Sequence, residues 1–225
     1  MIGAMITLYH CIDARSFRTL WMLEELDLPY ELKVLPFPPR ARARDYLAIN
    51  PLGTVPLLID GGARLTESSA TCQYLAARHS PGALDVGPRE PDYAAYLNWL
   101  HMSDATLTFP QTLVLRYERL EPPERRQPQV AQDYARWFLA RLRAVDAALA
   151  DERAHLCAGR FTAADVAVAY APMLAGRIGL GEQLPPRVRA YGERLARRPA
   201  FTRAQAAQRE AAIAQGVPAE PALNG

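Results

Sequence analysis

Lysine is nearly absent from this chain: Lys33 is the only one among 26 lysine and arginine residues in a sequence of 225. Because 24 aspartate and glutamate residues oppose them, the net charge is only +2. So small a charge predicts neither a nucleic-acid surface nor binding to an anionic membrane. Half of the residues are hydrophobic and 22% are charged, which is typical of a globular protein with a sizeable core.

Cysteine is scarce as well, since Cys11, Cys72 and Cys157 are the only three. Their odd number, their wide spacing and the lack of a CxxC pair disfavour a disulfide framework and structural zinc. We therefore expect no metal and a reducing compartment. The sequence has no run of 18 apolar residues and does not open on a basic segment before a long apolar run. We expect no membrane span, no signal peptide and a cytoplasmic protein.

Residues 1–80 change repeatedly between short apolar runs and helical periodicity. A strand–helix–strand unit followed by a hairpin and a helix is the order of an α/β thioredoxin-like domain, which we predict for this region. The predicted elements are a strand at 5–10, a helix at 16–28, a strand at 30–37, a short helical turn at 43–50, a strand at 55–60, a hairpin turn at Gly61 and Gly62, a strand at 63–67 and a helix at 68–79.

Residues 81–92 are rich in proline, glycine and charge, which predicts a linker between two domains. From 93 to 225 the periodicity is helical, so we expect an all-α C-terminal helical bundle whose first helix bends near Pro110. The segment that begins at Thr162 is apolar on every face, which predicts the buried central helix of the bundle. Thr162 and Asp165 predict a capping box at its start.

Four motifs stand in order along the chain: "SFRTLWMLEELDLPYE", "NPLGTVPLL", "TESSATCQYL" and "FTAADVAVA". With them the chain resembles the cytosolic glutathione transferases, and most of all the bacterial and fungal theta-like and nu-like group. The resemblance implies the glutathione transferase fold and a cytoplasmic homodimer with a role in detoxification. It also implies a transferase with glutathione as co-substrate, in which the glutathione thiolate attacks a small hydrophobic electrophile.

The resemblance implies that the Val55–Pro56 peptide bond is cis. Such a bond would turn the Val55 backbone toward the cysteinyl part of an extended glutathione molecule. Thr54 stands where many relatives carry a lysine that binds the tripeptide, so a weaker hydroxyl contact is implied. A basic loop could offer a cation to the glycyl carboxylate without any one residue being singled out; it contains Arg40, Arg42 and Arg44.

Glu67 and Ser68 stand where a predicted strand meets the start of a predicted helix. A helix N-terminus offers free N–H groups and a partial positive charge, which suits a carboxylate. By resemblance, Ser68 binds the γ-glutamyl carboxylate and Glu67 holds the γ-glutamyl amine or fixes the loop. Ser68 could also serve only as the helix N-cap.

The loop "HCIDARSFR" departs from the family's pattern where the thiol is activated. Relatives carry Ser, Tyr or Cys there, whereas this chain has Asp13 followed by Ala14, and neither side chain donates a hydrogen bond at neutral pH. Three alternatives remain for the activating group. They are the Ser16 hydroxyl, the amides of Ala14 to Ser16 helped by Arg15, and Cys11 acting through a mixed disulfide. Ser16 and Arg15 are the catalytic candidates.

By resemblance, the electrophile binds between the two domains, against the first helix of the bundle. Helix packing requires much of the same aromatic spacing that would line such a site. Asp104 or Asn98 could instead reach glutathione bound by a partner subunit. The candidates for the lining are Trp99, His101, Ser103 and Tyr117.

Two other functions stay open on the same fold. One is a glutathione-dependent reductase, peroxidase or isomerase. The other is a non-catalytic binding module, because a fold does not fix a function. Glu67-Ser68 and Val55-Pro56 disfavour the second, whereas the missing Ser, Tyr or Cys keeps it open.

Overall fold

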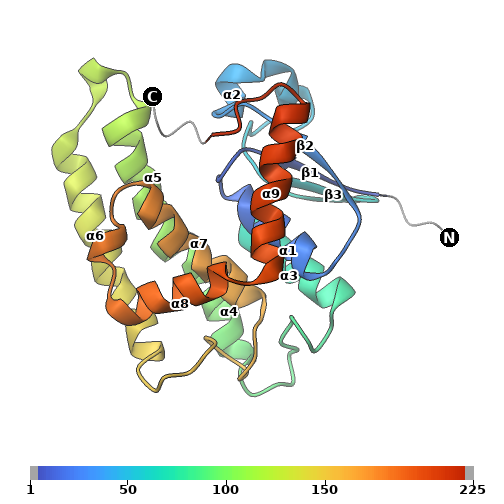
Figure 1. Cartoon of the computed structure of the whole chain (residues 1–225), viewed down its shortest axis with the longest axis vertical. Coiled ribbons are helices and arrows are strands. Elements are labelled where there is room, and N and C mark those ends of the chain that lie inside the picture. The colour runs from blue at the N-terminus through green and yellow to red at the C-terminus, as the bar shows by residue number, and fades with distance from the viewer. Residues whose placement is uncertain (1–4, 221–225) are drawn as a thin grey trace.

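The computed structural model describes residues 5–220. Figure 1 shows a small sheet with its helices next to a larger group of helices. The first part follows the predicted order of elements: the helical turn predicted at 43–50 is a 3-10 helix, and one further short helix precedes it. Its elements are β1 (Ile6–His10), α1 (Ser16–Glu25), β2 (Tyr30–Val34), α2 (Pro39–Arg42), a 3-10 helix (Arg44–Ala48), β3 (Leu57–Asp60), β4 (Ala63–Leu65) and α3 (Ser68–His79).

The four strands form one sheet in the order β2-β1-β3-β4. β1 runs parallel to β2 and antiparallel to β3, and β4 is antiparallel to β3. Leu8, in the middle of β1, pairs with Leu32 on one side and Leu58 on the other, and it is fully buried. The parallel crossover followed by an antiparallel hairpin confirms the predicted thioredoxin-like domain.

One long helical segment opens the second part, and its turn type changes along its length. α4 (Tyr93–Met102) continues into π-helical turns at Ser103–Thr108, then into α5 (Phe109–Leu115), then into π-helical turns at Arg116–Leu120. Pro110 lies in the first turn of α5 and has no N–H to donate to the preceding turn. Its position favours the wider π turns just before it, where the sequence predicts a bend.

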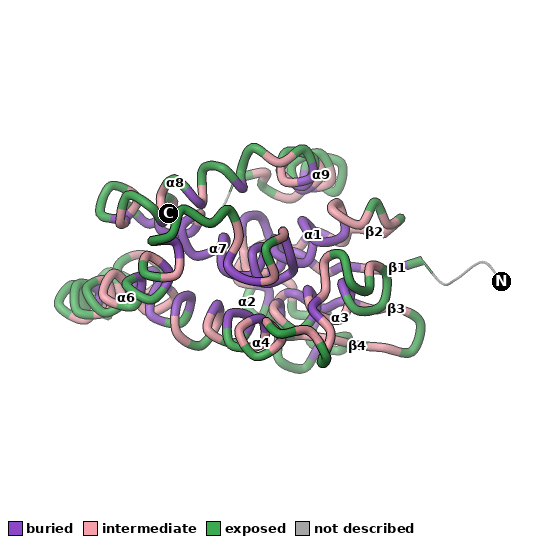
Figure 2. The backbone as a smooth tube through the Cα atoms, turned by 90° about the horizontal axis from the view of Figure 1, so that it is seen from below, coloured by how far each residue is buried: buried purple, intermediate pink, exposed green. Residues whose placement is uncertain are grey.

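The second part is otherwise helical, as predicted. α7 is its most buried helix, and Figure 2 shows it mostly in the buried colour, while the outer turns of α6 and α9 are exposed. Thr162 is the N-cap of α7, and its N–H donates to the Asp165 carboxylate at 2.9 Å, which confirms the capping box. The elements are α6 (Pro128–Ala148), α7 (Ala163–Arg177), α8 (Pro186–Ala196), α9 (Pro199–Ala214) and 3-10 helices at Pro123–Arg125 and Gly181–Gln183.

The last helix, α9, returns to the first domain and contacts α1 and β2 (Figure 1). Phe201 at its start packs edge-on against Phe17 and Trp21, with ring centroids 5.2 and 5.0 Å apart. Such aromatic contacts add to the stability that burial provides. The start of α9 is therefore packed against α1, the helix that follows β1.

The segment after α9 is attached to the edge of the sheet. Gln215 Nε2 donates to the Leu32 carbonyl at 2.8 Å, and the Val34 N–H donates to Gln215 Oε1 at 2.9 Å. These bonds occupy main-chain groups of the edge strand β2. The sequence from residue 215 onward, "QGVPAEPALNG", predicts a tail that is frayed or lies loosely on the surface. This prediction is wrong for Gln215, and residues 221–225 lie outside the described range.

The cysteines are buried and unpaired. Burial raises the pKa of Cys157 to about 11 and that of Cys72 to about 12, so both thiols stay protonated. Within residues 5–220, no three His, Cys, Asp or Glu side chains gather in a way that could hold a metal ion. None of the described helices is long and apolar enough to cross a membrane.

Candidate active site

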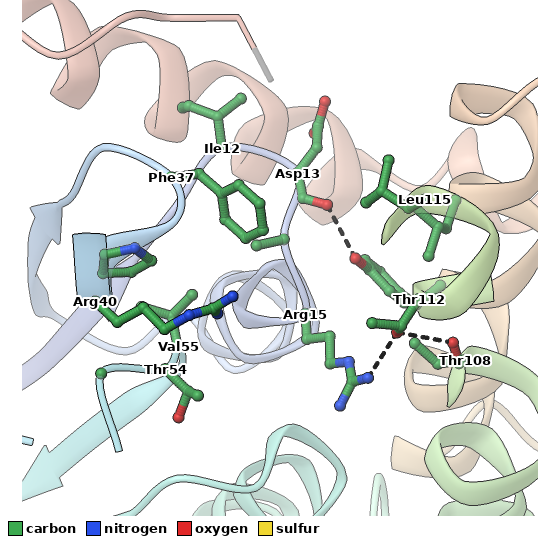
Figure 3. A pocket seen from close by; sticks show the side chains of 15 residues that line it. Ile12, Asp13, Arg15, Phe37, Arg40, Thr54, Val55, Thr108, Thr112 and Leu115 are labelled. Carbon is green, nitrogen blue, oxygen red and sulfur yellow. Dashed lines mark hydrogen bonds between the residues drawn. The ribbon is translucent and has the colours of Figure 1, made fainter. Parts of the chain in front are cut away.

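A pocket of about 260 Å³ lies where the first domain meets the long helical segment and α7. The first domain contributes the loop after β1, the start of α2 and the residues before Pro56; the second contributes residues from the π turns, α5 and α7. Figure 3 shows Arg15 extending toward Thr112, with Arg40 and Thr54 on the other side. The pocket therefore joins the predicted glutathione residues to the helical domain.

The Val55–Pro56 peptide bond is cis, as the resemblance implies, and Pro56 is buried. The Thr54 carbonyl accepts hydrogen bonds from Tyr46 Oη and Asn50 Nδ2, both at 2.9 Å. The N–H and C=O of Val55 have no partner among residues 5–220. Val55 thus presents two free main-chain groups at the pocket, on a segment that is held in place from its other side.

A close contact between two loops forms the side of the pocket near Thr54. Gly53 has a φ of +59°, and a Cβ built there would lie only 2.7 Å from Arg40 Cβ, so a side chain does not fit. Arg40 lines the pocket, whereas Arg42 and Arg44 do not, which singles it out of the basic loop. A second cis bond, Phe37–Pro38, precedes Arg40; nothing in the sequence indicates it.

Arg15, the N-cap of α1, lines the pocket, and the buried Ser16 follows it as the first residue of the helix. The N–H groups of Arg15 and Ser16 have no acceptor among the described residues, whereas the Ala14 N–H donates to the Cys11 carbonyl at 3.1 Å. The Arg15 guanidinium also lies in the pocket, and its Nη2 donates to Thr112 Oγ1 at 2.8 Å. Free N–H groups at a helix N-terminus and an adjacent cation both favour a bound anion.

The Ser16 hydroxyl does not line this pocket. Ser16 is fully buried, with Oγ 2.8 Å from His10 Nδ1 and also accepting from the Cys11 N–H at 3.3 Å. Its placement therefore does not support the catalytic role predicted for its side chain. Cys11 is also fully buried, and burial raises the pKa of its thiol, which argues against a mixed disulfide with glutathione there.

Asp13, for which the resemblance implies the position of an activating side chain, has a φ of +53°. Its carboxylate is fully engaged: Oδ2 lies 2.8 Å from Arg177 Nη2, and Oδ1 accepts from Gln208 Nε2 at 2.8 Å. An ionised Asp13 is expected to oppose a nearby thiolate, but the Arg177 cation compensates its charge. The acidic residue is therefore compatible with an anion in the pocket.

Ser68 and Glu67 lie at the start of α3, where the sequence predicts them. Ser68 is buried and its Oγ accepts from Arg18 Nη1 at 2.9 Å, while Glu67 is the exposed N-cap. The N–H groups of residues 68–70 have no acceptor within the described range. Neither side chain lines the 260 Å³ pocket itself, and Ser68 is linked to it through Arg18.

Arg18 connects the two domains from a fully buried position. Asp104, one of its partners, also lies 3.5 Å from Arg15. Burial acts to raise the pKa of Asp104, but Arg18 and Arg15 hold it below its usual range. Asp104 is thus paired with two arginines of its own chain. Its contact with glutathione bound by a partner subunit stays a prediction. The acceptors of Arg18 are Ser68 Oγ, Asp104 Oδ1, Thr108 Oγ1 and the carbonyls of Ser103 and Ala167, at 2.7 to 3.0 Å.

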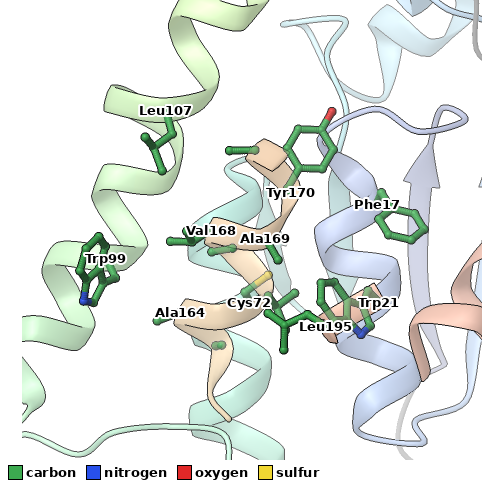
Figure 4. Packing of buried hydrophobic residues seen from close by; sticks show 14 of the residues in the cluster. Phe17, Trp21, Cys72, Trp99, Leu107, Ala164, Val168, Ala169, Tyr170 and Leu195 are labelled. Atoms are coloured by element: carbon green, nitrogen blue, oxygen red, sulfur yellow. The ribbon is translucent and has the colours of Figure 1, made fainter. Parts of the chain in front are cut away.

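The residues predicted for the electrophile site do not line the pocket. Trp99 is buried in the core and lies on the part of the long helix that faces α7 (Figure 4). The buried Ser103 hydroxyl donates to the Leu100 carbonyl at 2.6 Å, and His101 is exposed to solvent. Tyr117 borders a separate depression. The helix-packing explanation of this spacing fits these placements better.

Sequence reasoning missed the residues that do line the pocket from the helical domain. Thr108, Thr112 and Leu115 come from the long helical segment, and Tyr170 and Leu174 come from α7. Each residue added by a π turn rotates the following face by about 100° relative to an unbroken α-helix. The face that points to the pocket therefore changes between residues 103 and 108. The sequence signal that could have identified Thr108, Thr112 and Leu115 is their i, i+4 and i+7 spacing, which places them on one helical face.

Known proteins resemble this chain over most of its length. The profile of the family described as glutathione S-transferase, N-terminal domain, matches residues 14–78. Glutathione S-transferase GstB of Escherichia coli K12 is 30% identical over 203 residues, covering 87% of this chain and 95% of that protein. Glutathione S-transferase 3 of Schizosaccharomyces pombe is 38% identical over a shorter stretch, 46% of this chain and 43% of its own length.

A solved structure agrees with these sequence matches in its fold. Ure2p5 of Phanerochaete chrysosporium, cocrystallized with 1-(S-glutathionyl)-2,4-dinitrobenzene, superposes with a TM-score of 0.79 at 23% identity, covering 96% of this chain and 99% of that one. Fold, motif order and a near full-length relative at 30% identity lead to one conclusion: the chain belongs to the glutathione S-transferase family.

Proposed function

We propose that this protein binds glutathione and conjugates its thiolate to small hydrophobic electrophiles. The observation that carries the proposal is one pocket lined by Val55 and Arg15, both of which have free main-chain groups, with the free N–H of Ser16 next to Arg15 in sequence. The N–H and C=O of Val55 can pair with an extended peptide, and the N–H groups of Arg15 and Ser16 can donate hydrogen bonds to a thiolate. An extended tripeptide with a central thiol needs both.

The γ-glutamyl end of glutathione would reach the start of α3. Its carboxylate would accept from the free N–H groups of residues 68–70 and from the Ser68 hydroxyl. Because Ser68 Oγ already accepts from Arg18, its hydrogen is free to be donated to the ligand. Glu67, exposed at the N-cap, would pair with the γ-glutamyl amine.

The glycyl end would lie between the two loops that meet at Gly53. Arg40 lines the pocket there and would pair with the glycyl carboxylate. Thr54 would add a hydroxyl contact, and Val55 would hold the cysteinyl residue with Pro56 behind it in sequence. The thiol would then point to the start of α1.

Main-chain donors would replace the missing activating side chain. The N–H groups of Arg15 and Ser16, the helix dipole and the Arg15 guanidinium all favour the charged thiolate over the neutral thiol, and so lower the thiol pKa. The electrophile would lie over the opposite wall of the pocket, where Leu115 and Leu174 offer apolar surface. In the attack, the sulfur forms a bond to the electrophilic carbon as the leaving group departs with its electron pair.

The other activities receive less support from the structure. A reductase that forms a mixed disulfide needs an accessible low-pKa cysteine, whereas Cys11 is buried and has a raised pKa. A non-catalytic binding module would bind glutathione through the same contacts and would differ only in not activating its thiol. We extend the proposal to a cytoplasmic homodimer with a role in detoxification, for which sedimentation should give twice the mass of one chain.

Calorimetric titration with glutathione and turnover of an aryl halide test the proposal together. We expect binding at millimolar glutathione or below, turnover of the halide, and a roughly tenfold weaker affinity in Glu67→Gln, which removes a charged partner. Glu182→Gln, a change on the exposed turn before α8, is the matched control. Absence of binding at millimolar glutathione would rule out the proposal, and binding without turnover would favour the binding module.

A further inference from the structure

Gln208 is a buried amide on α9 that reaches the active-site loop from the far end of the chain. Its Oε1 accepts from the Asp13 N–H at 3.0 Å, and its Nε2 donates to Asp13 Oδ1 at 2.8 Å and to Gln205 Oε1 at 3.0 Å. Reversing the amide would place its oxygen against two other oxygens and its nitrogen against an N–H. Its orientation is therefore fixed by these three neighbours.

That orientation fixes the state of His10. His10 is fully buried, and its Nε2 lies 3.0 Å from Gln208 Oε1, which can only accept. His10 Nε2 must therefore carry the proton. Burial lowers the pKa of His10 to about 4, so the ring is neutral near pH 7 and its Nδ1 is an acceptor. The Asp13 carboxylate acts in the opposite direction and raises the pKa of His10, but burial has the larger effect.

The state of His10 in turn fixes the Ser16 proton. His10 Nδ1 lies 2.8 Å from Ser16 Oγ and has no proton to donate, so the hydroxyl donates to it. Ser16 Oγ then accepts from the Cys11 N–H at 3.3 Å. Through this chain, one glutamine on α9 sets the direction of the hydrogen bonds that His10 and Ser16 make beneath the loop.

We propose that Gln208 is a positioning residue for thiol activation: through Asp13 and through His10–Ser16 it holds the loop so that the Arg15 and Ser16 N–H groups face the pocket. This inference rests on the proposed function of that pocket. In this arrangement the Ser16 hydroxyl donates its hydrogen bond to His10 Nδ1, and therefore the hydroxyl cannot donate to a thiolate. Arg177 and Tyr170 hold other atoms of Asp13, which keeps the loop from being lost entirely when Gln208 is changed.

Gln208→Met tests the proposal, with Gln205→Ala as the matched control. Met fills a similar volume without an amide, while Gln205 accepts from Gln208 but does not contact the loop. In Gln208→Met we expect the pKa of the thiol of enzyme-bound glutathione to rise by about one unit. At a pH well below that pKa, such a rise lowers the thiolate fraction about tenfold. We expect binding of S-methylglutathione, which has no ionisable thiol, to change less than threefold in both variants. An unmoved thiol pKa in a folded Gln208→Met protein overturns the proposal.

Nitrogen-15 spectroscopy of His10 in the unaltered protein gives an independent reading. We expect the Nε2-protonated neutral tautomer from pH 6 to pH 8, without titration. An Nδ1-protonated or charged ring overturns the proposal even if Gln208→Met does not fold. If glutathione does not bind, the proposed function fails, whereas the His10 tautomer and the amide shifts of Arg15 and Ser16 in Gln208→Met still test the positioning.

Discussion

Replacing Arg18 with methionine should destabilise this protein more than most single substitutions, because the guanidinium is fully buried and has five acceptors. Removing one partner of a buried ion pair typically costs about 3–5 kcal/mol, since the other charge is left uncompensated. Asp104 is 17% exposed and keeps Arg15 at 3.5 Å, so the lower end of that range applies. We expect a loss of about 3 kcal/mol in the free energy of unfolding.

The stability that Arg18→Met loses relative to the unaltered protein should become smaller as the pH falls. The pKa of Asp104 is held below its ordinary value in the folded protein, so its ionisation stabilises the fold above the unfolded-state pKa of about 4. That contribution disappears as the pH falls through the lower folded-state value. Arg18→Met removes the nearer cation and should therefore lose less stability than the unaltered protein between pH 5 and pH 3.

Urea denaturation measures this prediction, with Arg141→Met, an exposed arginine on α6, as the control that should stay within about 0.5 kcal/mol. A double-mutant cycle with Asp104→Asn should give a coupling energy of about 1–3 kcal/mol. Because Arg18 also donates to Ser68 Oγ, glutathione affinity should fall in the same variant. A loss of stability below about 1 kcal/mol, or no coupling to Asp104, refutes the reasoning.

Three further substitutions test other contacts. Ser16→Ala should cost about 1–3 kcal/mol in urea denaturation, because it leaves a buried imidazole nitrogen and an N–H without partners. It should raise the pKa of the bound glutathione thiol by less than Gln208→Met does, because the contacts between Gln208 and Asp13 remain; a larger rise than in Gln208→Met would restore the hydroxyl as activator. Gly53→Ala should cost roughly 1–3 kcal/mol and weaken glutathione binding in calorimetry, since its Cβ would meet Arg40 at 2.7 Å; unchanged affinity contradicts this. Thr162→Ala should lower the free energy of unfolding by about 1 kcal/mol, against no change for the exposed Thr202→Ala.

Much of the fold could be predicted because its determinants are local. The apolar run at 5–10, the glycine pair at 61–62 and the capping box at Thr162 each depend on residues that are close in sequence. The family motifs identified the strand around Val55 and the start of α3 in the same way. Local patterns of this kind leave a periodic signal that a single sequence preserves.

The wall that the helical domain contributes to the pocket could not be predicted, because it depends on a helix whose turn type changes. Uninterrupted α-helical spacing places Trp99 and Ser103 on one face, and both are buried inside the bundle. The π turns at Ser103–Thr108 rotate the next face toward the pocket, which brings Thr112 there. Pro110 predicts that the helix bends, but it does not predict that the bend contains π-helical turns.

The network beneath the catalytic loop was also beyond sequence reasoning. His10 and Gln208 are 198 residues apart, and no spacing rule connects them. α9 comes near through tertiary contacts such as the packing of Phe201 against Phe17 and Trp21 and the ion pair of Arg203 with Glu24. A buried glutamine on a helix reads as an ordinary polar position until the tertiary structure shows what faces it.

The sequence departure at Asp13 and Ala14 therefore has a physical explanation other than lost activity. A side-chain activator donates one hydrogen bond to the sulfur, whereas two main-chain N–H groups and a guanidinium offer at least as much stabilisation if the loop is held rigidly. Asp13 contributes to that rigidity: its N–H, its carbonyl and both carboxylate oxygens are bonded to groups on α7 and α9. A serine or cysteine at this position could not make the contacts with Arg177 and Gln208 together. The residue that looks like a missing catalyst is thus the residue that fixes the proposed main-chain donors, and loop rigidity, not side-chain chemistry, should limit the thiol pKa.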